Sequence, residues 1–245
     1  MESFQVLGVR IDNISMLDTF DSIKRAIETG RKCVITTVNI HVVMEARKNR
    51  TLFEFLSASH INTPDSSQIC FLMRLRKKRF KERVTGADIF AKFPAFAAAH
   101  GITIGIFGGF GSAEKAKEKI EKERGARVVF TYSPTPEEVE HTSEALITQI
   151  NEANPDVLFV ALGCPKQEIW ISKNIGKLKP RVFVSIGAGL DFFVGAEKRA
   201  PLWMQKMGIE WMARLFSKPE KMAKRYLREL VFYWKFLKET VAGEN

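Results

Sequence analysis

The chain has 245 residues, of which 45% are hydrophobic and 27% charged, a composition typical of a globular protein that excludes wholesale disorder. Its three cysteines include no CxxC pair, so we expect a reducing cytosolic compartment, with neither a disulfide scaffold nor a structural zinc site. The sequence predicts no signal peptide, and no stretch has the roughly 20 near-continuous apolar residues of a membrane-spanning helix.

Short apolar runs alternate with longer amphipathic stretches through the first two-thirds of the chain. The runs predict strands over residues 5–9, 33–37, 102–107, 127–131, 157–162 and 182–186, with a short extended segment near 61–67. Helices are predicted over 16–29, 87–99, 113–124 and 137–153, the last capped by Thr135 with Pro136 at its first position. This alternation predicts an α/β fold over residues 1–195: a Rossmann-like, mostly parallel sheet with helices on both faces.

The chain changes character after residue 195. No strand is predicted over 196–245, and residues 201–217 and 219–240 are typical of two helices, which we call the appendage. From residue 198 on there are eleven basic and five acidic residues, and residues 74–83 hold seven basic and one acidic. These two patches account for the net charge of +10, so each calls for an anionic partner such as phosphate, nucleic acid or anionic membrane.

Polar residues follow several predicted strands, at the edge where open α/β sheets bind ligands. Thr37 and Asn39 share one face of an extended segment, where they can hydrogen-bond a sugar or cap the next helix. Asp65 follows a proline at another strand end, and its carboxylate can act as a general base or form a cap or turn.

Glycine-rich turns follow other strands. Gly108 and Gly109 precede a helix whose first N–H groups suit a phosphate, although a tight turn explains these glycines equally well. Neither GxGxxG nor GxxxxGK[ST] occurs, which removes the main support for dinucleotide or P-loop binding. The remaining candidates for contact with a polar ligand are Gln167, Glu168, Gly187 and Asp191.

Covalent and metal chemistry are not expected. Nothing in the sequence places a histidine beside Cys164, four scattered histidines have no metal-ligand spacing, and no Asp-x-Asp pair occurs. In the appendage, basic residues recur at steps of three and four beside tryptophan and tyrosine. They are Arg214, Lys218, Lys221, Arg225 and Arg228. This pattern fits an anionic membrane interface or a solvated face over core aromatics, and no nucleic-acid motif accompanies it.

Six groups of residues occur in a specific order along residues 8–226. They are Thr37-Val-Asn39; Thr63-Pro-Asp65; Glu82-Arg-Val-Thr-Gly-Ala-Asp88; Ala161-Leu-Gly-Cys-Pro-Lys-Gln-Glu168; Gly187-Ala-Gly-Leu-Asp191; and Lys198-Arg-Ala-Pro201 with Gly208-Ile-Glu-Trp211 and Arg214-Leu215. Together they resemble the WecG/TagA/CpsF family of bacterial glycosyltransferases. Ser66 stands where that family usually has glycine, and Lys221 where it usually has arginine.

The resemblance implies an inverting, metal-independent transfer of an N-acetylmannosamine-type or related hexose from a UDP-sugar to an undecaprenyl-diphosphate-linked sugar, in cell-surface polysaccharide synthesis. It implies that Asp65 deprotonates the acceptor hydroxyl beside Thr37 and Asn39. It also implies an appendage that contacts the cytoplasmic face of the plasma membrane and closes over the site. The nucleotide would lie near Gln167, Glu168, Gly187 and Asp191, and the cations available to the departing diphosphate are Arg214, Lys221 and Arg225.

The alternative is a non-catalytic α/β protein whose basic patches bind nucleic acid or an anionic membrane. Polar strand ends on one side of a sheet favour the enzyme, for which no metal, no other cofactor and no nucleic-acid partner is expected. The sequence leaves open the donor sugar, the acceptor, the polysaccharide pathway and whether the chain forms a homo-oligomer.

Overall fold

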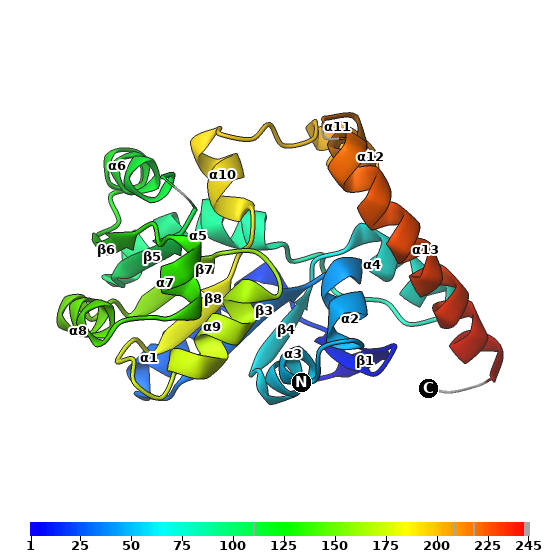
Figure 1. Ribbon diagram of the computed structural model, residues 1–245, viewed down its shortest axis with the longest axis horizontal. Helices are drawn as coiled ribbons and strands as arrows, with labels where there is room; N and C mark the ends of the chain where they lie inside the picture. Colours follow the sequence, from blue (N-terminus) through cyan, green and yellow to red (C-terminus); the bar gives the residue numbers. More distant parts are fainter. Residues whose placement is uncertain (110, 208, 218, 243–245) are drawn as a thin grey trace.

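The computed structural model describes residues 1–109, 111–207, 209–217 and 219–242 (Figure 1). Some residues of the C-terminal helices are described by their backbone alone: Lys206, Arg214, Phe216, Ser217, Lys221, Met222, Ala223, Lys224, Arg225, Arg228 and Ala242. The centre of the molecule is a six-stranded sheet, in the order β4-β3-β8-β7-β5-β6, in which every neighbouring pair is parallel. The predicted fold class is therefore confirmed.

The six strands begin and end close to the predicted residues. Their bounds are β3 Cys33–Val38, β4 Ile61–Pro64, β5 Ile104–Gly108, β6 Val128–Tyr132, β7 Val157–Ala161 and β8 Val182–Ser185. Successive side chains of a strand point to opposite faces of the sheet. In β7, Phe159 therefore joins one apolar core, while Leu158 joins another on the far side. Both faces are covered, as the continuously apolar strands predict.

Helices from different parts of the chain cover the two faces. One face carries α1 Met16–Glu28, α5 Gly86–His100, α6 Ala113–Arg124 and α10 Gly189–Val194. The other carries α3 Arg50–Ala58, α7 Pro136–Glu140, α8 Glu144–Ala153 and α9 Lys166–Asn174. A third core lies at the β4 end of the sheet and includes side chains of α2 Ile40–Ala46 and α4 Ser67–Leu75.

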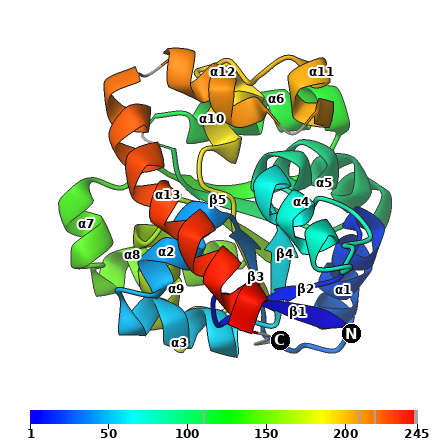
Figure 2. The same ribbon diagram turned by 90° about the vertical axis from the view of Figure 1, so that its right-hand side faces the viewer.

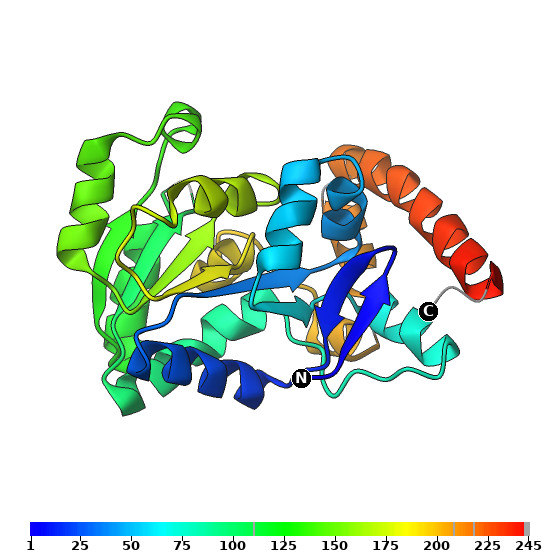
Figure 3. The same ribbon diagram turned by 90° about the horizontal axis from the view of Figure 1, so that it is seen from below.

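Three predicted elements were wrong in detail. The single strand expected over 5–9 is a hairpin of β1 Ser3–Val6 and β2 Val9–Asp12, because Leu7 and Gly8 adopt φ angles of 51° and 83° and reverse the chain. The hairpin lies beside β4 (Figure 3), where the Asp12 carboxylate accepts the Asn62 N–H at 2.7 Å.

The helix expected over 137–153 is divided into α7 and α8. Thr135 caps α7 as predicted, but the Ser143 hydroxyl accepts the N–H of Leu146 at 3.2 Å and so begins a second helix. The helix expected over 201–217 is likewise two helices, α11 Leu202–Met207 and α12 Glu210–Ser217. The last helix, α13 Pro219–Ala242, agrees with its prediction.

Helix α13 packs along the side of the molecule over α2 and ends near the β1–β2 hairpin (Figure 2). Phe232 and Phe236 are buried in the third core. The Arg76 guanidinium lies 3.8 Å from the centre of the Phe236 ring and donates to the Phe236 carbonyl at 2.8 Å. In the described part of the chain, no helix is both long and apolar enough to span a membrane. The predicted boundary at residue 195 stays a prediction.

We expect Phe232→Ala to lower the free energy of unfolding by about 3–5 kcal/mol, because it empties a fully buried site between α13 and the rest of the protein. Trp234→Ala, two residues further on, removes a side chain that is 57% exposed and should change stability by less than about 0.5 kcal/mol. Urea denaturation followed by circular dichroism measures both. Equal losses in the two variants would show that α13 does not pack as described.

Candidate active site at the carboxyl ends of the strands

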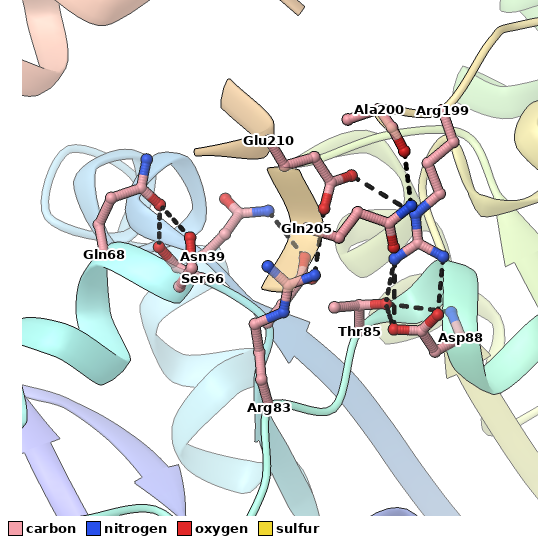
Figure 4. Close-up of polar contacts among 12 residues, drawn as sticks. Asn39, Ser66, Gln68, Arg83, Thr85, Asp88, Arg199, Ala200, Gln205 and Glu210 are labelled. Atoms are coloured by element: carbon pink, nitrogen blue, oxygen red, sulfur yellow. Dashed lines mark hydrogen bonds and ion pairs between the residues drawn. The ribbon is translucent and has the colours of Figure 1, made fainter. Parts of the chain in front are cut away.

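The carboxyl ends of β3 and β4 bring Asn39 and Asp65 together. The strand register pairs Val38 with Pro64, and the Asp65 N–H donates to the Val38 carbonyl at 3.0 Å, so the ladder continues one residue beyond β4. The Asn39 amide then donates through Nδ2 to Asp65 Oδ2 at 3.2 Å (Figure 4). Its Oδ1 accepts the Val42 N–H at 3.2 Å and caps α2, so the capping function is observed, and a hydrogen bond from Asn39 to a sugar stays a prediction.

Asp65 is not the cap of the helix that follows it. The side chain of Ser66 fills that place, with Oγ accepting the Ile69 N–H at 3.3 Å, and it also donates to Gln68 Oε1 at 2.8 Å. Ser66 is thus the N-cap of α4. The half-buried carboxylate of Asp65 instead takes part in contacts at the strand ends, such as the one with Asn39.

Thr37 lies beneath this pair. Its side chain is buried, and its hydroxyl donates to the Ser185 carbonyl of β8 at 3.2 Å. It therefore ties the end of β3 to the neighbouring strand. A direct contact of Thr37 with a substrate stays a prediction.

The turns after β7 and β8 are joined through Gln167. Its Oε1 accepts the Gly187 N–H at 3.1 Å, and its Nε2 donates to Glu168 Oε1 at 2.7 Å. Glu168 is fully buried, and burial raises its pKa to about 7, although the hydrogen bond from Gln167 acts in the opposite direction. Since the side chains of Gln167 and Glu168 are both buried, their observed function is to fix these two turns, and ligand contact stays a prediction.

The glycine turn after β5 lies against β7 and α10. A Cβ on Gly108 would lie 2.4 Å from the Ala161 carbonyl oxygen, and one on Gly109 would lie 2.0 Å from Leu190 Cδ2. Close packing against the β7 backbone therefore requires Gly108, whereas at Gly109 the positive φ of 75° favours glycine, whether or not a phosphate binds there. Ser112 donates to Asp191 Oδ1 at 3.0 Å and joins this turn to α10.

Arg83, for which the sequence predicts no individual role, lies beside the carboxyl end of β4. The N–H of Val84 donates to the Pro64 carbonyl at 3.0 Å, which holds the neighbouring Arg83 beside the end of β4. Arg83 Nη2 donates to Glu210 Oε2 of α12 at 3.1 Å (Figure 4). Only its place inside the Glu82–Asp88 motif could have pointed to it.

The environment of Cys70 on α4 includes the charges of both Arg83 and Asp65. Burial raises the pKa of this thiol to about 11; the charges of Arg83 and Arg74 lower it, and that of Asp65 raises it. The pKa of this α4 side chain is therefore affected by both the Arg83 guanidinium and the Asp65 carboxylate.

The amino-acid sequence matches a known protein family. Residues 4–245 match the family model described as glycosyl transferase WecG/TagA/CpsF family. The chain belongs to this family. It is therefore a glycosyltransferase, which confirms the predicted family and enzyme class and excludes the non-catalytic alternative.

Two relatives carry the name N-acetylglucosaminyldiphosphoundecaprenol N-acetyl-beta-D-mannosaminyltransferase. The protein of Bacillus subtilis (strain 168) is 33% identical over 198 residues, which are 80% of this chain and 76% of the relative. The protein of Staphylococcus aureus (strain MRSA252) is 26% identical over 211 residues, which are 85% of this chain and 82% of the relative.

Several predictions for this glycosyltransferase fall outside the described residues. They concern Lys218 and the side chains of Arg214, Lys221, Arg225 and Arg228. Among the residues that are described, no group of three or more His, Cys, Asp or Glu could hold a metal ion. A cavity of about 400 Å³ lies at the opposite edge of the sheet, beside Lys32, Asp156 and Arg181, and none of the predicted site residues lines it.

Burial of Glu168 should make the stability of this glycosyltransferase depend on pH. The unfolded chain loses this proton near the ordinary pKa of 4.5, and the folded protein near 7, so the unfolded state is favoured as the pH rises between these values. The group should cost roughly 3 kcal/mol of stability above pH 7 relative to acid conditions. Urea denaturation across this range should show a shallower decline in Glu168→Gln, whereas Glu144→Gln, at an exposed position, should keep the wild-type slope. An unchanged slope in Glu168→Gln would contradict this assignment.

Proposed function

We propose that this enzyme transfers N-acetylmannosamine, or a closely related hexose, from a UDP-sugar to a sugar carried on undecaprenyl diphosphate, in the synthesis of a cell-surface polysaccharide such as wall teichoic acid. The names of both relatives describe an N-acetylmannosaminyl transfer to N-acetylglucosaminyldiphosphoundecaprenol, and both align with most of this chain. These names support the substrate class.

The pairing of Asp65 with Asn39 at the strand ends carries the proposal for the reaction. A general base must lie within reach of the acceptor hydroxyl, and neighbouring groups must fix the direction of its side chain. The Asp65 backbone is fixed by the ladder bond to Val38, and its carboxylate by the amide of Asn39 at 3.2 Å. Asp65 is therefore our candidate for the general base.

The proposed chemistry is a single displacement. The acceptor hydroxyl oxygen forms a bond to C1 of the donor sugar while the bond from C1 to the UDP oxygen breaks on the opposite side, which inverts C1. The hydroxyl proton passes to Asp65, and the bonding electrons leave with UDP. Cationic side chains can stabilise this charge without a metal. Arg83 is available at the strand ends, and Arg214, Lys221 and Arg225 are our further candidates from the appendage.

The appendage presents a surface that suits a lipid-linked acceptor. Helix α13 buries Phe232 and Phe236 on one side, and large apolar side chains are exposed on another. The exposed residues are Leu227, Leu230, Val231, Trp234, Leu237 and Val241, and α11 adds Leu202, Trp203 and Met207. The Lys238 ammonium lies 4.1 Å from the Trp234 ring, and basic groups beside tryptophan favour an anionic membrane interface. We propose that this surface binds the cytoplasmic face of the plasma membrane.

Replacing the base tests the reaction. Asp65→Asn should lower the rate of transfer by about 10²–10⁴-fold, since it removes the proton acceptor but keeps the size of the side chain. The measurement is UDP release from a panel of UDP-sugars with a polyprenyl-diphosphate-linked N-acetylglucosamine acceptor. The matched control is Asp21→Asn, at an exposed position of α1. Wild-type activity retained in Asp65→Asn would refute the base. No transfer by the wild-type protein from any donor would refute the function.

The membrane surface is tested separately. The triple variant Leu230→Ser, Trp234→Ser, Leu237→Ser should reduce cosedimentation with anionic phosphatidylglycerol vesicles by about tenfold or more, because each change removes apolar area that would leave water. Leu17→Ser, which is equally exposed but lies on α1, should bind as the wild type does. Equal binding by both variants would place the membrane contact elsewhere.

A further inference from the structure

We propose that Glu210 is a positioning residue, whose carboxylate holds the Arg83 guanidinium in the active site and so makes the site depend on the docking of α12. This inference rests on the proposed function, because it assigns Arg83 to the reacting diphosphate.

Glu210 joins two arginines that are far apart in the sequence. Its Oε2 lies 3.1 Å from Arg83 Nη2, and its Oε1 lies 3.5 Å from Arg199 Nε (Figure 4). All three side chains are mostly buried, with 12% of Glu210 and 20% of each arginine exposed. A charge-assisted contact that is shielded from water is stronger and less screened than an ion pair on the surface.

Arg199 anchors this carboxylate to the rigid part of the fold. Its Nη1 lies 2.7 Å from Asp88 Oδ1, and its Nη2 donates to Asp88 Oδ2 at 3.2 Å. Asp88 is in the first turn of α5, where Thr85 also donates to it at 2.7 Å. Because α5 packs in the core through Phe90, the chain Asp88–Arg199–Glu210 fixes the start of α12 against the sheet domain.

Arg83 is in the opposite situation. It lies between α4 and α5, outside any helix or strand, so its long side chain depends on contacts for its direction. Glu210 supplies such a contact, while the bond from the Val84 N–H to the Pro64 carbonyl holds the Arg83 backbone next to the strand end that carries Asp65. Without Glu210, the Arg83 guanidinium would lose this ion pair and the direction that it sets.

The contact with Glu210 leaves Arg83 able to bind phosphate. A guanidinium has five N–H donors in a planar fork, and the bond to Glu210 Oε2 uses one of them. Held in this direction, Arg83 can stabilise the charge that appears on the departing diphosphate. Glu210 would thus affect the rate of transfer without touching the substrate.

A double-mutant cycle distinguishes positioning from general stabilisation. We would measure kcat and KM for the UDP-sugar in the wild type, Glu210→Gln, Arg83→Lys and the double variant. We expect Glu210→Gln to lower kcat about tenfold in the wild type and less than about twofold in the Arg83→Lys background, because the two residues act as one unit. Equal factors in both backgrounds would overturn the proposal.

Glu239→Gln is the matched control. Glu239 also docks the appendage, with its Oε2 3.8 Å from Arg76 Nη2, but far from Arg83 along α13. This variant should lower the thermal midpoint about as much as Glu210→Gln does, with kcat within about twofold of the wild type. A similar loss of kcat in Glu239→Gln would show that docking in general, and not the carboxylate of Glu210, controls activity.

A second measurement does not depend on transferase activity. The Arg83 Nε–H signal in a ¹⁵N-arginine NMR spectrum, assigned through its loss in Arg83→Lys, reports the order of this side chain. It should be ordered in the wild type and in Glu239→Gln, and mobile in Glu210→Gln. Unchanged order in Glu210→Gln would overturn the positioning role even if no UDP-sugar were a substrate, whereas a mobile signal with an inactive wild type would refute only the proposed reaction.

Discussion

A parallel sheet that is packed on both faces leaves only its two ends for polar chemistry. In this glycosyltransferase, α1, α5, α6 and α10 cover one face, and α3, α8 and α9 cover the other. The turns after β3, β4, β7 and β8 therefore meet at one edge. The ladder itself sets the geometry of that edge, because the hydrogen bond from Asp65 to the Val38 carbonyl extends the pairing of β3 and β4 into the site. The candidate base is consequently placed by backbone bonds, and only its final direction depends on Asn39.

Several other polar side chains at this edge form hydrogen bonds or ion pairs with one another. Glu168 is an example, because burial is unfavourable for its charged carboxylate. This carboxylate accepts a hydrogen bond from the Gln167 amide nitrogen, and the Gln167 amide oxygen accepts the Gly187 N–H. Two turns from adjacent strands are thereby locked together. Arg199 and Asp88 form a similar lock on the other side of the site. Such buried polar networks can lower the stability of the fold, but they fix one arrangement of the side chains.

The sequence predicts the sheet well, because apolar runs and helix caps are local signals. The cap at Thr135 was identified from three adjacent residues. The failures have equally clear causes. Leu7 takes a positive φ that its residue type does not favour, so no turn signal precedes Gly8, and Ser143 restarts a helix where the apolar period continues. The contact of Arg83 with Glu210 spans 127 residues and leaves no periodic trace, so the sequence places the arginine in a charge patch and a family motif but does not predict this contact.

The two sides of α13 explain how one helix can serve the fold and the proposed membrane contact at once. Successive residues of a helix are turned by about 100°, so Phe232 and Trp234 point in nearly opposite directions. Phe232 is completely buried against the third core, and Trp234 is 57% exposed. Docking to the protein and contact with a bilayer therefore use different apolar stripes and do not compete. Because the preceding helix α12 begins at Glu210, the same docked arrangement that aims Trp234 outward also brings a carboxylate to Arg83. In the proposed enzyme, the surface that reaches the lipid-linked acceptor and the contact that orders Arg83 consequently belong to one packed unit.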